Sequence, residues 1–186
     1  MRQSILKTGA FILTGALALL GSGCATLSEG ECYTADWHQL GRVDGQRGYE
    51  RSRLYEHQKA CAEYGIRPDA TAYYRGRQIG LASYCTPANG YDEGRAGHTY
   101  RGVCPAKYEP RFLAAYRDGK LVHEAEEDIE EVERDIDRQE DILDDDESTS
   151  EARRDARREL RLLYDQLRRL NHERNRLERT MMRYRY

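Results

Sequence analysis

The fold is decided by residues 121–143, which read LVHEAEEDIEEVERDIDRQEDIL. Charged residues fill most of this stretch, and the uncharged ones recur three and four positions apart. That spacing places the uncharged side chains on one seam of a long helix, as in a coiled coil. The seam comprises Val122, Ala125, Ile129, Val132, Ile136, Gln139 and Leu143. A helix with such a seam needs a second helix to cover it.

A second seam follows the polar loop at residues 144–150. Its members alternate four and three apart: Ala156, Leu160, Leu163, Leu167, Leu170, Arg174, Leu177, Met181 and Tyr184. The two helical stretches, 110–143 and 151–184, have the same length. Matched helices joined by a short polar loop predict an antiparallel coiled-coil hairpin over residues 110–186. A turn centred on Glu147 places Val132 opposite Leu163.

Charge favours pairing of these two helices with each other. Residues 121–150 contain fifteen acidic residues and two arginines, whereas residues 151–186 contain twelve arginines and six acidic residues. Each helix alone repels itself, and the two attract when they lie side by side. An exposed ion pair contributes only about 0–1 kcal/mol, so charge selects the partner while the seams supply the stability. The alternative is that each helix pairs with another chain.

Glycine and tyrosine dominate residues 36–109. The chain has fourteen Tyr but only two Phe and one Trp, and a Tyr ring can pack while its hydroxyl bonds to a partner. Two pairs of glycines stand four residues apart, which predicts two helices whose backbones approach closely. The pairs are Gly41 with Gly45 and Gly76 with Gly80. The alternative at Asp44-Gly45 is a turn, and residues 88–104 are predicted to be rich in turns.

The amino terminus is typical of a bacterial lipoprotein signal. Arg2 and Lys7 precede an apolar run over residues 9–20, and small residues then lead to Cys24. The resemblance implies a signal peptide over residues 1–23, with cleavage before Cys24 and acyl chains such as palmitate on that cysteine. Membrane attachment is then through lipid.

The alternative to a lipoprotein signal is a membrane-spanning anchor. The apolar run has only about twelve residues, whereas a spanning helix needs roughly twenty. One departure from the usual signal is Gly21, which stands where Leu is common. The mature chain is expected to begin with a tether over residues 24–35. Ala25 after the cysteine implies sorting to the outer membrane, on its periplasmic face.

Four cysteines remain once Cys24 carries lipid, and an exported protein is expected to pair them. We predict the disulfides Cys32–Cys61 and Cys85–Cys104, although four cysteines allow three pairings. The rival is a metal site that includes His57, but no C-x-x-C motif occurs and the cysteines are too widely spaced. No metal or other cofactor is expected. The predicted fold is mostly α: a small Gly- and Tyr-rich domain stapled by disulfides, then the long hairpin.

Several short motifs of the Gly/Tyr region run in one order. They are Asp36-Trp37, Asp44-Gly45-x-x-Gly48, His57-x-x-x-Cys61, Tyr74-x-Gly76-Arg77-x-x-Gly80-Leu81, Tyr84-Cys85-Thr86, Asn89-Gly90 and Val103-Cys104. This series resembles the bacterial envelope family known as domain of unknown function 2799, over roughly residues 32–120. The resemblance implies a lipoprotein, and it brings no known activity or site residue.

An enzyme would need a convergent polar cluster, and the sequence offers only scattered candidates. These are Asp36, His38, Asp44, His57 and His98. No nucleophile-elbow, zinc-protease or phosphate-loop motif appears. His57 lies on the apolar face of its predicted helix, which favours a core histidine, and Asp44 is interpreted as a turn residue. We therefore expect no catalytic residue, and a hydrolase is the least favoured class.

Aromatic residues offer a second interpretation, because they could stack on sugar rings. The candidates are Trp37, Tyr73, Tyr74, Tyr91 and Tyr100. The competing interpretation is that these rings form the core, since other large apolar residues are scarce. The function expected is a non-enzymatic outer-membrane lipoprotein whose residues 110–186 meet an envelope protein. A peptidoglycan-binding module is the alternative, and the acidic helix and exported location argue against a nucleic-acid partner.

Overall fold

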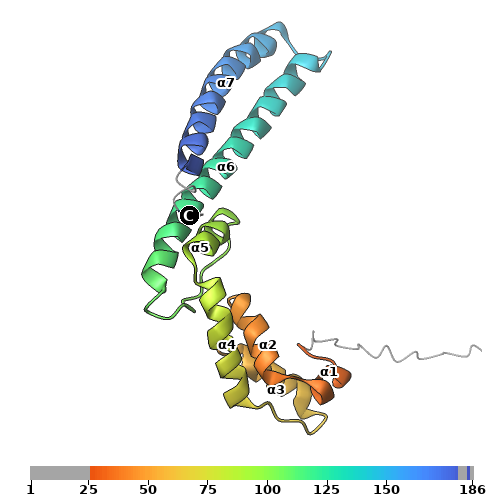
Figure 1. Cartoon of the computed structure of the whole chain (residues 1–186). Helices are drawn as coiled ribbons and strands as arrows, with labels where there is room; N and C mark the ends of the chain where they lie inside the picture. The colour runs from red at the N-terminus through yellow and green to blue at the C-terminus, as the bar shows by residue number, and fades with distance from the viewer. Residues whose placement is uncertain (1–25, 180–183, 185–186) are drawn as a thin grey trace, which may run out of the picture.

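All regular structure in the described part of the chain, residues 26–179 and Tyr184, is helical in this computed structural model (Figure 1). The helices are α1 (Glu29–Thr34), α2 (Trp37–Gln46), α3 (Arg53–Ala62), α4 (Ala70–Tyr84), α5 (Pro87–Arg95), α6 (Glu109–Asp144) and α7 (Ser150–Glu178). The predicted mostly α fold is confirmed. None of these helices is long and apolar enough to cross a membrane. Cys24 and the expected signal peptide lie outside the described residues.

Helices α2 and α4 touch backbone to backbone, and four glycines make this possible. A Cβ atom added to Gly41 or Gly45 would collide with a carbonyl of α4, and one added to Gly76 or Gly80 with a carbonyl of α2. An interior glycine costs about 1 kcal/mol of helix stability relative to alanine, so the contact between the helices must offset that cost. The turn expected as an alternative at Gly45 does not form, because α2 continues to Gln46.

Helices α5 and α6 repeat this arrangement. A Cβ atom added to Gly90 or Gly94 would collide with a carbonyl of α6, and one added to Gly119 with a carbonyl of α5. In both pairs a glycine with positive φ follows the first helix, Gly48 at +66° and Gly97 at +71°. The chain therefore contains the same glycine-packed helix pair twice, as α2 with α4 and as α5 with α6.

The prediction of turns over residues 88–104 is wrong for its first half. Residues 87–95 form α5, and the turns come only after it. Thr86 caps this helix by accepting a hydrogen bond from the Asn89 amide, and Pro87 occupies its first turn. The glycines of α5 contact the backbone of α6. Local sequence does not distinguish a glycine at such a contact from a glycine in a turn.

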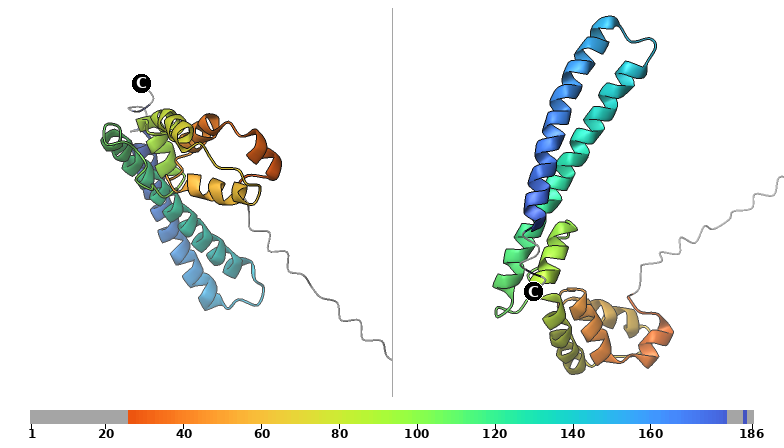
Figure 2. Two further views of the ribbon diagram at one scale, coloured as in Figure 1. Left: turned by 90° about the horizontal axis from the view of Figure 1, so that it is seen from below. Right: turned by 45° about the horizontal axis from the view of Figure 1, so that its top comes forward.

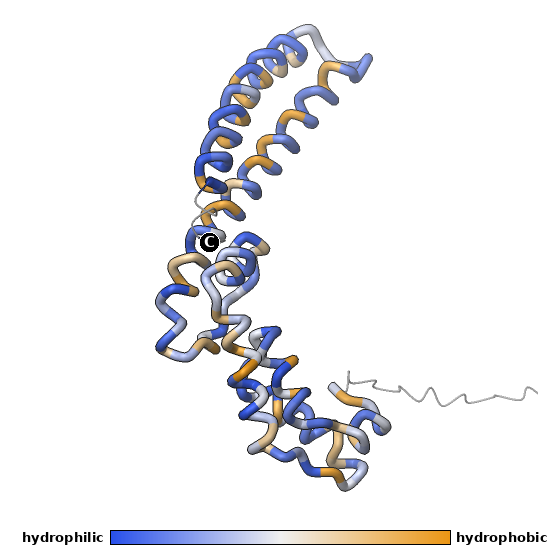
Figure 3. The backbone as a smooth tube through the Cα atoms, viewed as in Figure 1, coloured by the Kyte–Doolittle hydropathy of each residue, from blue (hydrophilic) through white to orange (hydrophobic). Residues whose placement is uncertain are grey.

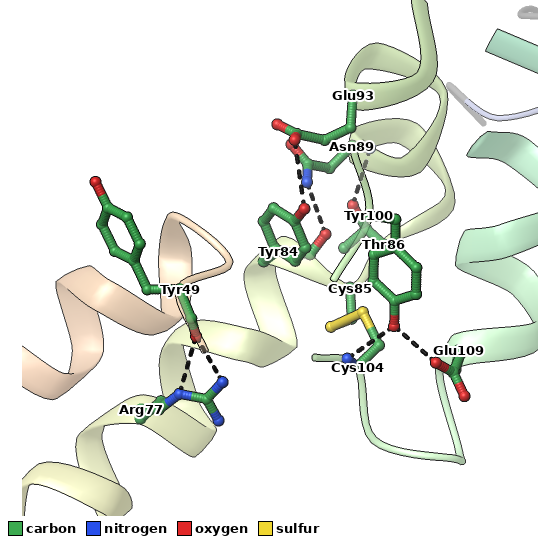
Figure 4. The surroundings of a disulfide bond; sticks show 10 residues. All are labelled: Tyr49, Arg77, Tyr84, Cys85, Thr86, Asn89, Glu93, Tyr100, Cys104 and Glu109. Carbon is green, nitrogen blue, oxygen red and sulfur yellow. Dashed lines mark hydrogen bonds between the residues drawn. A yellow bond between two sulfur atoms is a disulfide. The ribbon is translucent and has the colours of Figure 1, made fainter. Parts of the chain in front are cut away.

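Both disulfides are present with the predicted pairing. Cys32–Cys61 joins α1 to α3, and Cys85–Cys104 joins the end of α4 to the loop before α6 (Figure 4). Their sequence separations are 29 and 19 residues. Loops of this size correspond to about 3 kcal/mol of stabilisation each in the chain-entropy model.

The described part of the expected tether, residues 26–35, is folded. Ser28 caps α1 through reciprocal hydrogen bonds with Glu31, and Leu27 is buried against the Cys32–Cys61 disulfide. One disulfide and one buried leucine thus fix a segment that looks like a short polar linker in sequence. The folded body reaches to within two residues of Cys24.

Helices α6 and α7 lie side by side and antiparallel, as predicted (Figure 2). Val132 and Ile136 of α6 are buried with Leu160 and Leu163 of α7. Apolar bands recur along both helices (Figure 3). Thr149 caps α7 by accepting a hydrogen bond from the Ala152 amide. The two seams therefore cover each other within one chain.

Val132 and Leu163, which the count around Glu147 places opposite each other, share one buried cluster. The Tyr164 hydroxyl donates to Glu140 over 2.7 Å, where the count places Arg154. Side chains lean toward the amino end of their helix, and tyrosine reaches far. This one long side-chain contact therefore falls beyond the position on α7 that the count gives for Glu140.

Helix α6 belongs to both halves of the molecule. Its first turns pack on α5, where Tyr91 is buried with Val122. Further along, one Arg95 nitrogen of α5 bonds to Glu126 of α6 at 2.7 Å and to Glu178 of α7 at 2.8 Å. The boundary expected between residues 109 and 110 coincides with the start of α6, but packing continues across it.

Candidate functional site

A chain of buried polar groups links α2, α3 and α4 to the amino-terminal segment. The Tyr73 hydroxyl donates to Asp44 Oδ2 over 2.7 Å, and His57 Nε2 lies 2.8 Å from the same oxygen. The other ring nitrogen, Nδ1, lies 2.8 Å from the Thr26 hydroxyl oxygen. A carboxylate only accepts hydrogen bonds, so Nε2 must carry a hydrogen and donate it.

Burial gives this network a structural role. Asp44 is 4% exposed, His57 2% and Tyr73 fully buried. A hydroxyl, an imidazole and a carboxylate in series resemble the parts of a catalytic triad, but these atoms are enclosed by the helices. The cavities described below are lined by other residues. The network therefore fastens Thr26, and with it the amino-terminal segment, to the helical body.

Burial also controls the ionisation of tyrosine in this region. Removal from water raises the pKa of the Tyr73 hydroxyl well above its usual range, and the hydrogen bond to Asp44 raises it further. The pKa of Tyr84 is raised by burial first and by the charge of Glu93 second. Both hydroxyls thus remain hydrogen-bond donors at any physiological pH.

The five aromatic candidates for stacking do not share one surface. Tyr73 and Tyr91 are buried, so neither presents a ring face to a ligand. Trp37 packs beside the Cys32–Cys61 disulfide. Tyr100 packs on the core around the other disulfide, where its hydroxyl donates to Glu109 and accepts from the Cys104 amide (Figure 4). Tyr74 is half-buried and carries Arg51 over its ring.

A cleft of about 350 Å³ opens between α4 and the loop that follows α5. Its charged lining consists of Arg51, Arg77, Arg101 and Glu50. Leu81, Val103 and Pro105 supply an apolar wall. A second cleft of about 370 Å³ shares Arg101 and adds Arg47, Tyr84, Glu93 and His98. Positive charge therefore gathers where the two glycine-packed pairs meet.

The comparison with protein families gives a match over residues 36–121, to the family described as a protein of unknown function, DUF2799. Residues 36–121 are a DUF2799 domain. No curated protein and no solved structure matches the chain. The DUF2799 domain begins at the cap of α2 and ends within α6, so it holds both glycine-packed pairs. Most of the hairpin and all of α1 lie outside it.

Metal ligation has no support in the described residues. No group of three or more His, Cys, Asp or Glu side chains there is arranged to hold an ion. The four cysteines of residues 26–179 are used in disulfides. His57, the histidine weighed as a ligand, already has partners on both ring nitrogens.

Two residues of the DUF2799 domain have roles that differ from the expectation from sequence. Asp44 is not part of a turn but the acceptor at the centre of the buried network. Arg77 received no role, yet it is buried at the wall of the first cleft. A signal existed for Asp44, because it follows Leu40 by four residues and shares its helix face. The same signal existed for Arg77, which stands four residues after Tyr73 and four before Leu81.

Proposed function

We propose that this chain is a non-enzymatic envelope lipoprotein, anchored through Cys24 at the periplasmic face of the outer membrane, whose hairpin docks a protein partner. The observation that carries the proposal is the projection of α6 and α7 away from the body (Figure 1). At the standard rise, the 29 residues of α7 extend about 44 Å. Such an arm suits a protein that reaches from a fixed point toward another component.

The way the amino-terminal segment is held supports an anchor at Cys24. Thr26 is hydrogen-bonded to buried His57, and Leu27 is buried. Only Ala25 separates Thr26 from Cys24. A lipid on that cysteine would hold the helical body close to the membrane surface and would give the hairpin a fixed base.

The surface of the hairpin supports docking. Leu162 of α7 is 62% exposed and Leu121 of α6 is 48% exposed. Large apolar side chains in contact with water are natural contact points for another protein. Exposed ion pairs lie close to them in sequence, Arg158 with Asp155 on α7 and Lys120 with Glu124 on α6, and charges of this kind improve selectivity more than affinity.

The anchor is tested by Cys24→Ser in the native host. We expect the variant to remain an unprocessed precursor without lipid, whereas the unchanged chain is shortened and fractionates with the outer membrane. Metabolic labelling with a fatty-acid analogue reads out the lipid. A Cys24→Ser chain that is matured and membrane-bound as before would refute the anchor.

The docking arm is tested with a photo-reactive residue in place of Leu162. The matched control is the same residue in place of Tyr55, which is 67% exposed on α3. We expect one discrete protein adduct in living cells from position 162 and none from position 55. Equal adducts from both positions, or adducts with peptidoglycan alone, would contradict a protein-docking role for the hairpin.

A further inference from the structure

Arg77 is a buried cation without an ionic partner. Its side chain is 7% exposed. Its Nε and Nη2 atoms both donate to the carbonyl oxygen of Tyr49, at 3.2 and 2.6 Å (Figure 4). No carboxylate of the described residues forms an ion pair with it, unlike Arg95, which has two. A carbonyl neutralises no charge, so the guanidinium has no direct ion pair and only the more distant charge of Asp44 acts in its favour.

The guanidinium of Arg77, which has no direct ion pair, lies at the wall of the first cleft. One edge of the group is used by Tyr49, and Nη1 has no hydrogen-bond partner among the described residues. Figure 4 shows this remaining nitrogen turned away from the carbonyl. A guanidinium presents paired N–H groups that match the two oxygens of a carboxylate or phosphate. The free edge of Arg77 has the geometry for such a contact.

Two more arginines line the same cleft. Arg51 and Arg101 are exposed, and Arg51 is held over the Tyr74 ring with its guanidinium carbon 4.4 Å from the ring centre. Burial is the main cause that lowers the pKa of Arg77, and the positive charge of Arg51 adds to it, whereas Tyr73, Tyr74 and Asp44 act in the opposite direction. Glu50 is the only acid in the lining. Positive charges that repel one another would be relieved by an anion between them.

The cleft also has an apolar side. Leu81, Val103 and Pro105 also line it, and the Cys85–Cys104 disulfide fixes the loop that carries two of them. A volume of about 350 Å³ is at the small end for ligand sites. The space suits an anionic group joined to a short apolar body.

We propose that this cleft is a binding site for an oxyanion, carboxylate or phosphate, carried on a small apolar body. The free edge of Arg77 accepts the oxyanion in a bidentate contact, and Arg51 and Arg101 close on it from the solvent side. The apolar part lies against Leu81 and Val103. The ligand is either a free small molecule or the head of a lipid, since both present this chemistry.

The test is calorimetric titration of the full chain in an uncharged detergent, at constant ionic strength. The probes are hexyl phosphate, hexanoate and inorganic phosphate. We expect one site per chain, filled more tightly by one of the two hexyl probes than by inorganic phosphate, because only the hexyl probes use the apolar wall. Absence of saturable binding up to about 10 mM of each hexyl probe would overturn the proposal.

Three variants locate the site. Arg77→Lys keeps the positive charge but loses the paired N–H groups of the guanidinium. We expect the affinity for the hexyl probe to fall about tenfold or more. Arg101 is exposed, so Arg101→Gln leaves the core intact. We expect this variant to bind the hexyl probes more weakly, and that result locates the site even if Arg77→Lys fails to fold. Arg75→Gln removes an exposed charge from the same helix, outside the cleft. Equal losses in Arg75→Gln and Arg101→Gln would show general charge attraction and refute a site.

Competition separates the two sources of ligand. Micelles that contain phosphatidic acid are added to the complex with hexyl phosphate. Displacement identifies a lipid head as the ligand class, and retention identifies a soluble one. Both results support the site, provided that Arg101→Gln binds hexyl phosphate more weakly than the unchanged chain in the direct titration.

Discussion

Asp44 is a carboxylate inside a helical core, and its neighbours decide whether its burial is tolerable. A buried charge without partners costs several kcal/mol, whereas one that accepts two hydrogen bonds recovers much of that cost. His57 and Tyr73 supply the two donors. Each of them is itself buried, so every member of the network depends on the others.

Removal of this acceptor should be far more damaging than removal of an exposed aspartate. Asp44→Ala leaves His57 and the Tyr73 hydroxyl buried without their partner, and we expect the free energy of unfolding to fall by about 3–5 kcal/mol. Asp36→Ala removes an exposed N-cap of the same helix and should cost only about 1 kcal/mol. Urea denaturation measures both. Similar losses in the two variants would show that the network contributes nothing special.

Buried tyrosines predict a loss of stability at alkaline pH. Burial is the main cause that raises the pKa of Tyr100 to about 12, from about 10 in an unfolded chain. A raised pKa means that the folded state holds the proton more tightly. This contribution to stability is complete below pH about 10 and is lost as pH rises through about 12. Tyr73 and Tyr84 act in the same direction.

Ultraviolet titration of tyrosinate checks this expectation. The buried tyrosines should ionise only at higher pH, together with loss of helix. In concentrated urea all should titrate together. A native curve that coincides with the urea curve would contradict the raised pKa values.

At the scale of helices, glycine contact replaces the leucine packing that most helical domains use. Gly76 and Gly80 of α4 each face a carbonyl of α2. The helices can then approach until backbones touch, and the surrounding tyrosines fill the flanks. The same solution recurs in α5 and α6, where Ala115 is buried completely. Tight backbone contact explains how a polar chain with few large apolar residues still forms a core.

Alanine at a contact glycine should therefore act oppositely to alanine at an open one. In Gly80→Ala the new Cβ meets the Arg42 carbonyl, and overpacking should cost about 1–3 kcal/mol. Gly30 in α1 has nothing within 4 Å of such a Cβ, so Gly30→Ala should stabilise by up to about 1 kcal/mol. Thermal unfolding compares the two variants. A neutral or stabilising Gly80→Ala would refute the close contact.

Across the whole molecule, the body and the hairpin are joined through a single continuous helix. The first part of α6 is covered by α5 and the rest by α7. Charge is distributed along the same axis, since acidic residues dominate α6 beyond Leu121 and arginines dominate α7. The hairpin can therefore open while the glycine-packed pairs remain, because the two packing regions share few side chains.

A charge in the seam should separate these two regions. Leu163 is 6% exposed and Leu162 is 62% exposed. Leu163→Asp places an unpaired carboxylate in the seam, which is costly, so amide hydrogens of α7 should exchange rapidly while those of α2 and α4 stay protected. Leu162→Asp should leave exchange unchanged. Dissociation of a dimer by Leu163→Asp, measured by sedimentation, would instead show that the seams pair between chains.

Much of the local architecture follows from sequence. The spacing of Val132, Ile136, Leu160 and Leu163 favours a hairpin, because a helix with one apolar seam must cover it and the nearest complementary seam is one short loop away. The disulfide pairing is the one predicted, Cys32–Cys61 and Cys85–Cys104, out of the three that four cysteines allow. The order of glycines and cysteines also predicts the match of residues 36–121 to the DUF2799 family.

Only the tertiary structure determined the roles of the contact glycines, of Asp44 and of Arg77. Gly90 and Gly94 look like turn residues until α6 lies against them, since the same missing side chain permits a turn or a close contact. Asp44 and Arg77 look like surface charges until other helices cover them. Burial depends on segments far away in the chain, so periodicity determined the elements of this protein, whereas packing determined its buried charges and the cleft beside them.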